Sequence, residues 1–277
     1  MKMKKVLKMA MALAMAASLV GCGSSSSSDD VEQFVVGMEV NYAPFNWSAT
    51  EESDTTAPTT DGVSYADGYD VQIAKLIAED MGKELVVKKL DWDGLIPALE
   101  SGEIDAIIAG MTATDEREEG ADFTTPYFDG GGLVMIVKKG SKQASYTKKS
   151  QFSGQTVIGQ KGTAYDDAVD QIEGVKHATP LKTYPELVVA LQNDDVVGIT
   201  AEMPVAMGIC QANDDLTYVE FDSDDAFDYD STVSIGMKEG SKDSDLFKAV
   251  QAALDKITDD QRKEIMADCV SRAPTSD

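Results

Sequence analysis

Short apolar runs alternate with amphipathic stretches from Phe34 onward, and no other feature of the sequence restricts the fold as strongly. The runs at 104–109 and 133–137 are apolar without sustained alternation, as expected for strands that are covered on both faces. Segments with apolar residues at helical spacing, such as 71–81, separate these runs. The alternation predicts an α/β fold in which helices flank the sheets.

Capping residues mark several helix starts along the chain. Asp70 is expected to cap the helix that begins beside it. Thr183 with Glu186, and Thr258 with Gln261, have the spacing of capping boxes, in which each side chain bonds the backbone amide of the other residue. Each of these signals predicts a helix start independently of the apolar pattern.

Two polar segments interrupt the pattern, and two cysteines follow the first of them. Residues 48–67 are expected to form a long surface insertion, and the acidic residues 222–230 a loop.

Cys210 and Cys269 could pair in an oxidising compartment. We favour two separate buried thiols, because Cys210 follows a short helical run whereas Cys269 belongs to the last helix.

Residues 1–22 have the organisation of a secretory signal. A basic start precedes an apolar run at 9–20, which is too short to cross a bilayer core of ~30 Å as a helix. The following Leu-Val-Gly-Cys resembles the lipobox of bacterial lipoproteins, so Cys22 is expected to be lipidated, with an ordinary thiol as the alternative. Residues 23–30 are rich in Ser and predict a flexible tether. We expect an extracytoplasmic protein on the outer face of the plasma membrane of a Gram-positive-type bacterium.

The composition excludes several classes of function. The 277 residues can hold two ordinary lobes or one large domain. There are 24 basic and 49 acidic residues, so nucleic acid is not an expected partner, because duplex binding depends on Lys and Arg that neutralise phosphates. His177 is the only histidine, and neither a metal-ligand cluster nor a nucleophile beside a base is evident. We therefore expect no catalytic residue, cofactor or metal.

Five segments occur in an order that is typical of one family. They are Tyr42-Ala-Pro-Phe45, Gly68-Tyr-Asp-Val-Gln-Ile-Ala74, Asp91-Trp-Asp-Gly-Leu-Ile-Pro-Ala-Leu99, Gly102-Glu-Ile-Asp-Ala-Ile-Ile-Ala-Gly-Met-Thr-Ala-Thr-Asp-Glu-Arg117 and Asp122-Phe-Thr-Thr-Pro-Tyr127. From Phe34 to about Arg272 the chain thereby resembles the bacterial extracellular solute-binding protein family 3, the polar-amino-acid receptors of ABC importers.

The resemblance implies a type II periplasmic-binding-protein-like fold. In this fold two lobes, each a mixed sheet flanked by helices, are joined by two hinge crossings. We expect lobe 1 to comprise residues 31–137 and 231–277, and lobe 2 residues 138–230. The crossings are expected near 137–141 and 228–232.

The resemblance also implies a cleft that holds the carboxylate and the ammonium group of a free amino acid. Arg117 is the expected partner of the carboxylate, because a guanidinium offers two parallel charge-assisted hydrogen bonds. The preceding turn supplies Gly110, Met111 and Thr112 for backbone and hydroxyl contacts. Thr163 in lobe 2 is expected to be a second carboxylate contact, or a plain helix cap.

Four further residues complete the expected ligand site. Glu202 should bind the ammonium group, although relatives commonly have Asp at this place. Tyr42 and Trp92 match aromatic positions that enclose the ligand's side chain, with core packing as the alternative. Glu39 matches an acidic position near the tip of that side chain, and Gln160 belongs to the same set. The acid favours a polar or cationic L-amino acid, such as arginine, lysine, ornithine or histidine, without identifying which one.

These features together predict a lipid-anchored, monomeric substrate-binding protein of an amino-acid ABC importer. It would close its lobes around one free amino acid and deliver it to a permease with its ATPase. Two alternatives remain open, namely a dehydratase-like enzyme on the same fold and a sensory ligand-binding module. A nucleophile beside a base would favour the first, and a signalling segment after the domain would favour the second.

Overall fold

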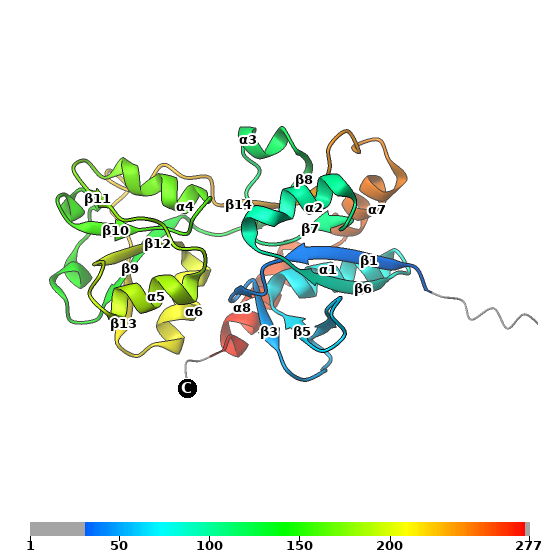
Figure 1. Ribbon diagram of the computed structural model, residues 1–277, viewed down its shortest axis with the longest axis horizontal. Coiled ribbons are helices and arrows are strands. Elements are labelled where there is room, and N and C mark those ends of the chain that lie inside the picture. The colour runs from blue at the N-terminus through cyan, green and yellow to red at the C-terminus, as the bar shows by residue number, and fades with distance from the viewer. Residues whose placement is uncertain (1–30, 275–277) are drawn as a thin grey trace, which may run out of the picture. The chain divides into compact units, whose positions relative to one another are not determined.

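The computed structural model describes residues 31–274, and the expected signal segment, Cys22 and the tether lie outside these residues. The described chain forms two sheets of five strands and a smaller sheet of four strands (Figure 1). We call the sheet that contains the first strand, together with its helices, lobe 1, and the other five-stranded sheet with its helices lobe 2. The α/β fold with mixed sheets is as predicted.

Lobe 1 is built on a mixed sheet in the order β6-β1-β7-β14-β8. β1 runs parallel to β6 and β7, and β14 runs antiparallel to β7 and β8. Phe34, Val36 and Met38 on β1 are fully buried against the helices. The elements of lobe 1 are β1 (Gln33–Met38), α1 (Tyr69–Asp80), β6 (Glu84–Lys89), η1 (Trp92–Gly94), α2 (Leu95–Ser101), β7 (Ala106–Ile107), α3 (Asp115–Glu118), β8 (Ala121–Asp129), β14 (Thr232–Lys238), α7 (Asp245–Leu254) and α8 (Asp259–Arg272).

Lobe 2 is built on a second mixed sheet in the order β11-β10-β12-β9-β13. β10 is parallel to β11 and β12, and β9 is antiparallel to β12 and β13. Figure 1 shows α4, α5 and α6 around this sheet. The elements of lobe 2 are β9 (Leu133–Lys138), η2 (Lys142–Ser145), η3 (Lys149–Phe152), β10 (Thr156–Ile158), α4 (Ala164–Asp167), η4 (Ala168–Gln171), β11 (Lys176–His177), α5 (Tyr184–Gln192), β12 (Gly198–Glu202), α6 (Met203–Ala212) and β13 (Leu216–Val219).

The position of β9 corrects the predicted lobe boundary. Its residues were expected to end lobe 1 at 137, whereas Ile136 pairs with Ile199 of β12 in the sheet of lobe 2. The first crossing therefore lies at 130–132, where Gly131 and Gly132 have φ angles of 81° and 91°. An apolar run predicts a buried strand but does not specify which sheet the strand joins, and this is why the boundary was placed too late.

The small sheet adds strands to the expected surface segment 48–67. Its antiparallel order is β2-β3-β5-β4, with β2 (Asn41–Tyr42), β3 (Asn46–Ala49), β4 (Ala57–Pro58) and β5 (Tyr65–Asp67). Ala57 and Ala66 are buried, and Thr59 forms a parallel bridge with Val87 of β6. Part of the polar segment is thus packed on lobe 1 through small buried residues, while more than half of its residues are exposed.

The capping predictions have different outcomes. Both capping boxes are present, at Thr183 with Glu186 and at Thr258 with Gln261. The prediction for Asp70 is wrong, because the N-cap of α1 is Gly68 and no side chain caps that helix. Asp70 is instead fully buried. A helix start can be recognised from composition, but the direction of one acidic side chain depends on its tertiary neighbours.

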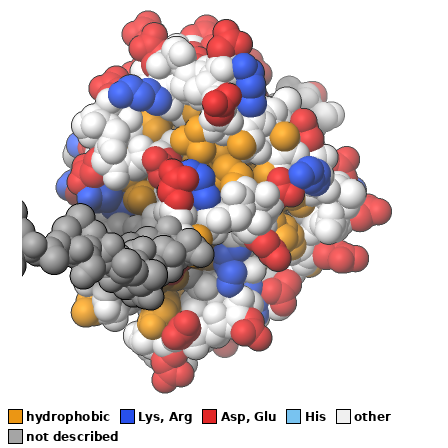
Figure 2. All heavy atoms as spheres, turned by 90° about the vertical axis from the view of Figure 1, so that its right-hand side faces the viewer, with side chains coloured by type: hydrophobic (Ala, Val, Ile, Leu, Met, Phe, Trp, Pro, Cys, Tyr) orange, Lys and Arg blue, Asp and Glu red, His pale blue; other side chains and the backbone are white. Residues whose placement is uncertain are grey.

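The two cysteines do not pair. Cys210 and Cys269 are free thiols, as favoured from the sequence, but only Cys269 is buried, whereas Cys210 is half-buried. Within residues 31–274, no helix combines the length and the apolar character that a bilayer crossing requires. Figure 2 shows one face of the molecule, on which Asp and Glu side chains are widely spread and Lys and Arg side chains lie among them.

Replacement of Gly159 by Ala should destabilise the protein by about 1–3 kcal/mol, the usual cost of overpacking. A Cβ atom at Gly159 would lie 2.4 Å from Asp166 Cα and 2.6 Å from Asp166 N, so α4 would have to move away from β10. Urea unfolding measures the loss. Gly94→Ala is the control, because a Cβ atom there meets nothing within 4 Å. Equal stability of Gly159→Ala and wild type would show that α4 does not pack as described.

Candidate functional site

A cleft of about 470 Å³ lies between lobe 1 and the start of α4 in lobe 2. Four residues of the expected ligand site line it, namely Trp92, Met111, Arg117 and Thr163. The other lining residues are Asp93, Ile96, Thr114, Glu116, Gly162, Ala164 and Asp167. The structure therefore brings together, from both lobes, part of the set that the sequence predicted.

Arg117 is held in this cleft by lobe 1. Its Nη1 donates a hydrogen bond to the carbonyl oxygen of Thr112 at 2.8 Å, and its guanidinium carbon lies 5.1 Å from the ring centroid of Trp92. Among residues 31–274, no carboxylate forms an ion pair with Arg117. Burial lowers the pKa of Arg117 from its ordinary value, but a guanidinium remains charged in proteins. The site thus presents an oriented cation that forms no ion pair among the described residues, although Glu116 and Asp167 line the same cleft and their charges favour its charged form.

The lobe 2 side of the cleft is the turn that precedes α4. Thr163 occupies the N-cap position of α4, and its hydroxyl donates to the carbonyl oxygen of Gln160 at 2.7 Å. The carbonyl oxygen of Gly162 accepts a hydrogen bond from Trp92 Nε1 at 2.9 Å. The Thr163 hydroxyl therefore holds its own turn, and Gly162 connects this turn to lobe 1.

Glu39 and Gln160 contact each other directly across the lobes. Glu39 follows β1, and both of its carboxylate oxygens accept from Gln160 Nε2, at 3.2 and 3.0 Å. Gln160 Nε2 also donates to the carbonyl oxygen of Lys182 at 2.9 Å. Burial raises the pKa of Glu39 to about 7; the bond from Gln160 opposes this shift, and the charges of Asp91 and Asp93 add to it. This carboxyl group can therefore change its charge near neutral pH.

Glu202 lies at the end of β12 and is fully buried. Its Oε1 accepts hydrogen bonds from the hydroxyls of Tyr165 and, at 3.3 Å, Tyr229. Its Oε2 has no hydrogen-bond partner among the described residues. Burial raises the pKa of Glu202 to about 8, although both tyrosine hydroxyls favour the charged form. Glu202 is not among the described residues that line the cleft around Arg117.

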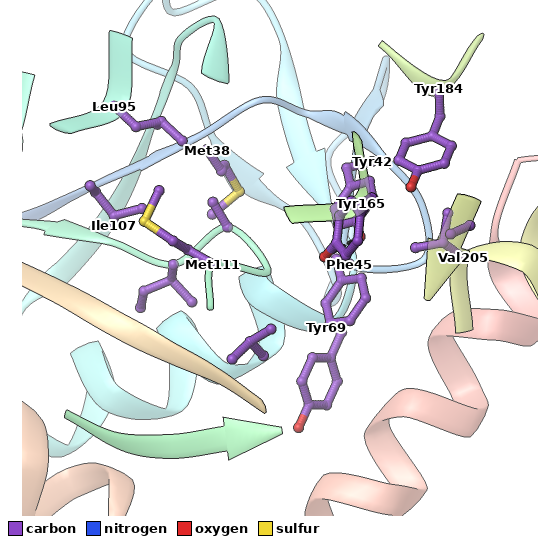
Figure 3. Close-up of a cluster of buried hydrophobic side chains, with 14 of the residues drawn as sticks. Met38, Tyr42, Phe45, Tyr69, Leu95, Ile107, Met111, Tyr165, Tyr184 and Val205 are labelled. Atoms are coloured by element: carbon purple, nitrogen blue, oxygen red, sulfur yellow. Dashed lines mark hydrogen bonds between the residues drawn. The ribbon is translucent and has the colours of Figure 1, made fainter. Parts of the chain in front are cut away.

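A cluster of four tyrosines surrounds Glu202, and only one of them was expected in the site. The hydroxyl of Tyr42 donates to that of Tyr165 at 3.1 Å, and the rings of Tyr42 and Tyr184 are 5.4 Å apart. The rings of Tyr165 and Tyr229 are 5.5 Å apart. Figure 3 shows Tyr42, Tyr165 and Tyr184 close to one another. We call these four residues the tyrosine cluster.

The sequence contained some signal for the three tyrosines that were missed. Tyr165 stands two residues after Thr163, and Tyr229 lies within the expected second crossing at 228–232. Tyr184 is the first residue of α5, directly after the capping threonine. Proximity along the chain to an expected site residue or crossing would have been sufficient to nominate them. Their convergence on one carboxylate depends on the tertiary fold.

The charges of Arg117 and Glu202 are connected by a short chain of polar contacts. The carbonyl oxygen of Thr112 accepts from Arg117, and Thr112 Oγ1 lies 3.2 Å from the hydroxyl of Tyr229. That hydroxyl in turn donates to Glu202. Tyr229 therefore lies between the guanidinium and the carboxylate, which were expected to contact opposite ends of one ligand.

Gly110 has a steric role that no other residue could perform without strain. Its φ angle is 62°, and a Cβ atom there would lie 2.8 Å from Cε1 of Tyr42. The Tyr42 ring stacks on Phe45 with a centroid distance of 5.3 Å, and Phe45 meets Tyr69 edge to face at 6.0 Å (Figure 3). The turn at Gly110 thus approaches Tyr42 closely because glycine has no side chain.

Two ion pairs at the rim also join the lobes, and the sequence did not predict them. Lys161 Nζ lies 3.2 Å from Asp93 Oδ2, and Lys182 Nζ lies 3.1 Å from Asp91 Oδ2. All four side chains are at least half exposed. Exposed pairs of this kind contribute little to stability. These two pairs connect the edge of lobe 1 to the edge of lobe 2.

Comparison with known proteins finds a family whose members resemble the part of the chain that contains the expected site. The model of the bacterial extracellular solute-binding proteins, family 3, matches residues 34–268. A probable histidine-binding protein of Campylobacter jejuni is 32% identical over 196 residues, which are 70% of this chain and 70% of the relative. The arginine-binding extracellular protein ArtP of Bacillus subtilis is 28% identical over 95% of this chain and 96% of its own.

A solved structure supports the fold. The amino acid ABC transporter substrate-binding protein AbpA of Streptococcus pneumoniae, bound to L-arginine, superimposes with a TM-score of 0.73 and 26% identity. The match covers 88% of this chain and 97% of that structure. The predicted type II two-lobed fold is therefore confirmed.

Replacement of Glu202 by Gln should flatten the pH dependence of stability. The folded-state pKa of about 8 lies above the ordinary value of 4.5, so the folded protein binds more protons than the unfolded chain between these values. The free energy of unfolding therefore falls as pH rises through this range, by up to about 1.4 kcal/mol per pH unit for this group. Glu202→Gln removes that contribution.

Urea unfolding at pH 5, 6, 7 and 8 measures this difference between wild type and variant. Glu220→Gln, which changes an exposed carboxyl group, is the matched control. If the curves of Glu202→Gln and wild type run parallel, Glu202 is not buried as a titrating group.

Proposed function

Because the chain belongs to the bacterial extracellular solute-binding proteins, family 3, we propose that it binds one free amino acid in the cleft between its lobes. The family and the relatives are substrate-binding proteins of transporters and not enzymes. This decides against the dehydratase-like alternative. The observation that carries the proposal is the guanidinium of Arg117, oriented in the interlobe cleft without an ion-pair partner in the described chain.

The ligand is proposed to be a polar or cationic L-amino acid. The carboxylate would bind Arg117, whose planar group matches two oxygens. The ammonium group would bind the free Oε2 of Glu202 after a shift of Tyr165 and Tyr229, and a cationic side chain would bind Glu39. Relatives named for histidine and arginine support this class of ligand.

Lobe closure is proposed as the step that retains the ligand. Contacts between the lobes are already present at Glu39 with Gln160 and at Trp92 with Gly162. Closure around a ligand excludes water and thereby strengthens each polar contact with it. The closed protein would then deliver the amino acid to a permease with its ATPase.

Attachment to the membrane is proposed from the sequence alone. Residues 1–21 would be removed as a signal, and lipid on Cys22, then the first residue, would hold the protein at the outer face of the plasma membrane. Residues 23–30 would let the folded part move near the permease. We propose that the protein acts there as a monomer.

Arg117→Ala should lower the affinity for the ligand at least about 100-fold, because two charge-assisted hydrogen bonds are lost at ~1.5–3 kcal/mol each. Isothermal calorimetry with L-arginine, L-histidine and L-glutamine measures this, after a thermal-shift comparison of the three with wild type. Arg117→Lys should recover only part of the affinity, because an ammonium group lacks the planar pair of donors.

Lys263→Ala is the control, because it removes one exposed positive charge from α8. It should bind like wild type. Unchanged affinity of Arg117→Ala, with its fold intact by circular dichroism, would contradict the proposed site. A wild-type protein that binds no amino acid would contradict the proposed function.

A further inference from the structure

Asp70 is a fully buried acid that the ligand site does not use directly. It is the second residue of α1, where Gly68 is the N-cap and no side chain caps the helix. Its carboxylate is therefore available for tertiary contacts. Oδ1 accepts from the hydroxyl of Tyr127 at 2.6 Å, and Oδ2 accepts from Nδ2 of Asn46 at 2.8 Å.

Each of these two partners continues to a backbone amide of the site. The hydroxyl of Tyr127 accepts from the amide of Gly110 at 2.9 Å. Oδ1 of Asn46 accepts from the amide of Val40 at 2.7 Å. Asp70 is thus the centre of a network with two arms, which we call the Asp70 network.

The two amides belong to residues in the left-handed region of backbone conformation. The φ angle is 62° at Gly110 and 60° at Val40. A β-branched residue such as valine adopts this conformation only where the surrounding structure imposes it. Val40 follows Glu39, and Gly110 precedes Met111, so each arm ends beside a residue of the expected site. The network therefore holds the backbone at two turns that adjoin residues of the expected site.

Burial raises the pKa of Asp70 to about 7, whereas the hydrogen bonds from Tyr127 and Asn46 favour its charged form. Both oxygens of Asp70 act as acceptors, so the single proton of the Tyr127 hydroxyl points to Asp70 and a lone pair faces Gly110. In Asn46 the amino group faces Asp70, so its oxygen faces Val40. Hydrogen bonds to an ionised acceptor are stronger than neutral ones. Asp70 thus sets the direction of all four hydrogen bonds.

We propose that Asp70 is a positioning residue, which fixes the amides of Gly110 and Val40 through Tyr127 and Asn46 and thereby orders two turns of lobe 1 that adjoin residues of the expected site. The proposal rests on the proposed function for its consequence in binding. Its structural part concerns only the two amides.

The test compares Asp70→Asn and Tyr127→Phe in the full chain. Asp70→Asn replaces one acceptor by a donor at nearly constant size, and Tyr127→Phe removes the hydroxyl that joins Asp70 to Gly110. Both variants should weaken L-arginine binding about tenfold or more by calorimetry. In the ligand-free protein, NMR should show the amide proton of Gly110 moving upfield in both, and that of Val40 in Asp70→Asn.

Tyr69→Phe is the matched control for a lost buried hydroxyl. Tyr69 is also fully buried, and its hydroxyl donates to the backbone carbonyl oxygen of Tyr127 at 2.9 Å, a bond that does not involve the Tyr127 hydroxyl or Asp70. This variant should be destabilised but should keep L-arginine affinity within twofold and leave both amide signals in place. A merely structural role of Asp70 predicts the same for all three variants.

The proposal is overturned if Tyr127→Phe binds L-arginine like wild type, if its Gly110 amide signal does not move, or if Tyr69→Phe loses as much affinity. If Asp70→Asn fails to fold, Tyr127→Phe alone tests the proposal through L-arginine affinity and the Gly110 amide signal. A wild-type protein that binds no amino acid overturns the proposed function, and the amide signals then still decide whether Asp70 holds the two turns.

Discussion

Burial of carboxyl groups without a cation is the constraint on which the arrangement of this protein depends. Glu39, Asp70 and Glu202 are all buried, and within residues 31–274 none of them forms an ion pair. An unpaired buried charge is costly unless hydrogen bonds compensate for it. Each of the three therefore organises its own set of donors, and these donors come from distant parts of the chain.

The hydrogen-bond donors to these acids connect lobe 1, lobe 2 and the candidate site. Glu39 in lobe 1 accepts from Gln160 in lobe 2, and Glu202 accepts from two hydroxyls of the tyrosine cluster. Arg117 is the counterpart of these acids, yet it faces the cleft instead of pairing with any of them. An amino acid carries both charges, so it can satisfy the guanidinium and an acid at the same time. This complementarity links the internal electrostatics to the proposed ligand.

Much of the fold could be predicted from the sequence, and the errors share one cause. The α/β class and both capping boxes are as predicted. The lobe boundary and the cap at Asp70 are corrected by strand pairing and burial, and the exposed segment 48–67 contains short strands that were not predicted. For the candidate site, the sequence nominated residues that the structure places in the cleft, such as Arg117 and Thr163, but it did not nominate Tyr165 or Tyr229.

Local patterns were sufficient for the strand and helix pattern, for the helix starts at Thr183 and Thr258, and for the ordered motifs of the family, because periodicity and capping involve residues a few positions apart. Long-range contacts alone decided the sheet that β9 joins, the partners of Asp70 and the tyrosine cluster. Asn46 and Asp70 are 24 positions apart, and Tyr42 and Tyr165 are 123 apart. No local pattern encodes such pairs, because each forms only when distant parts of the chain have come together in the folded protein.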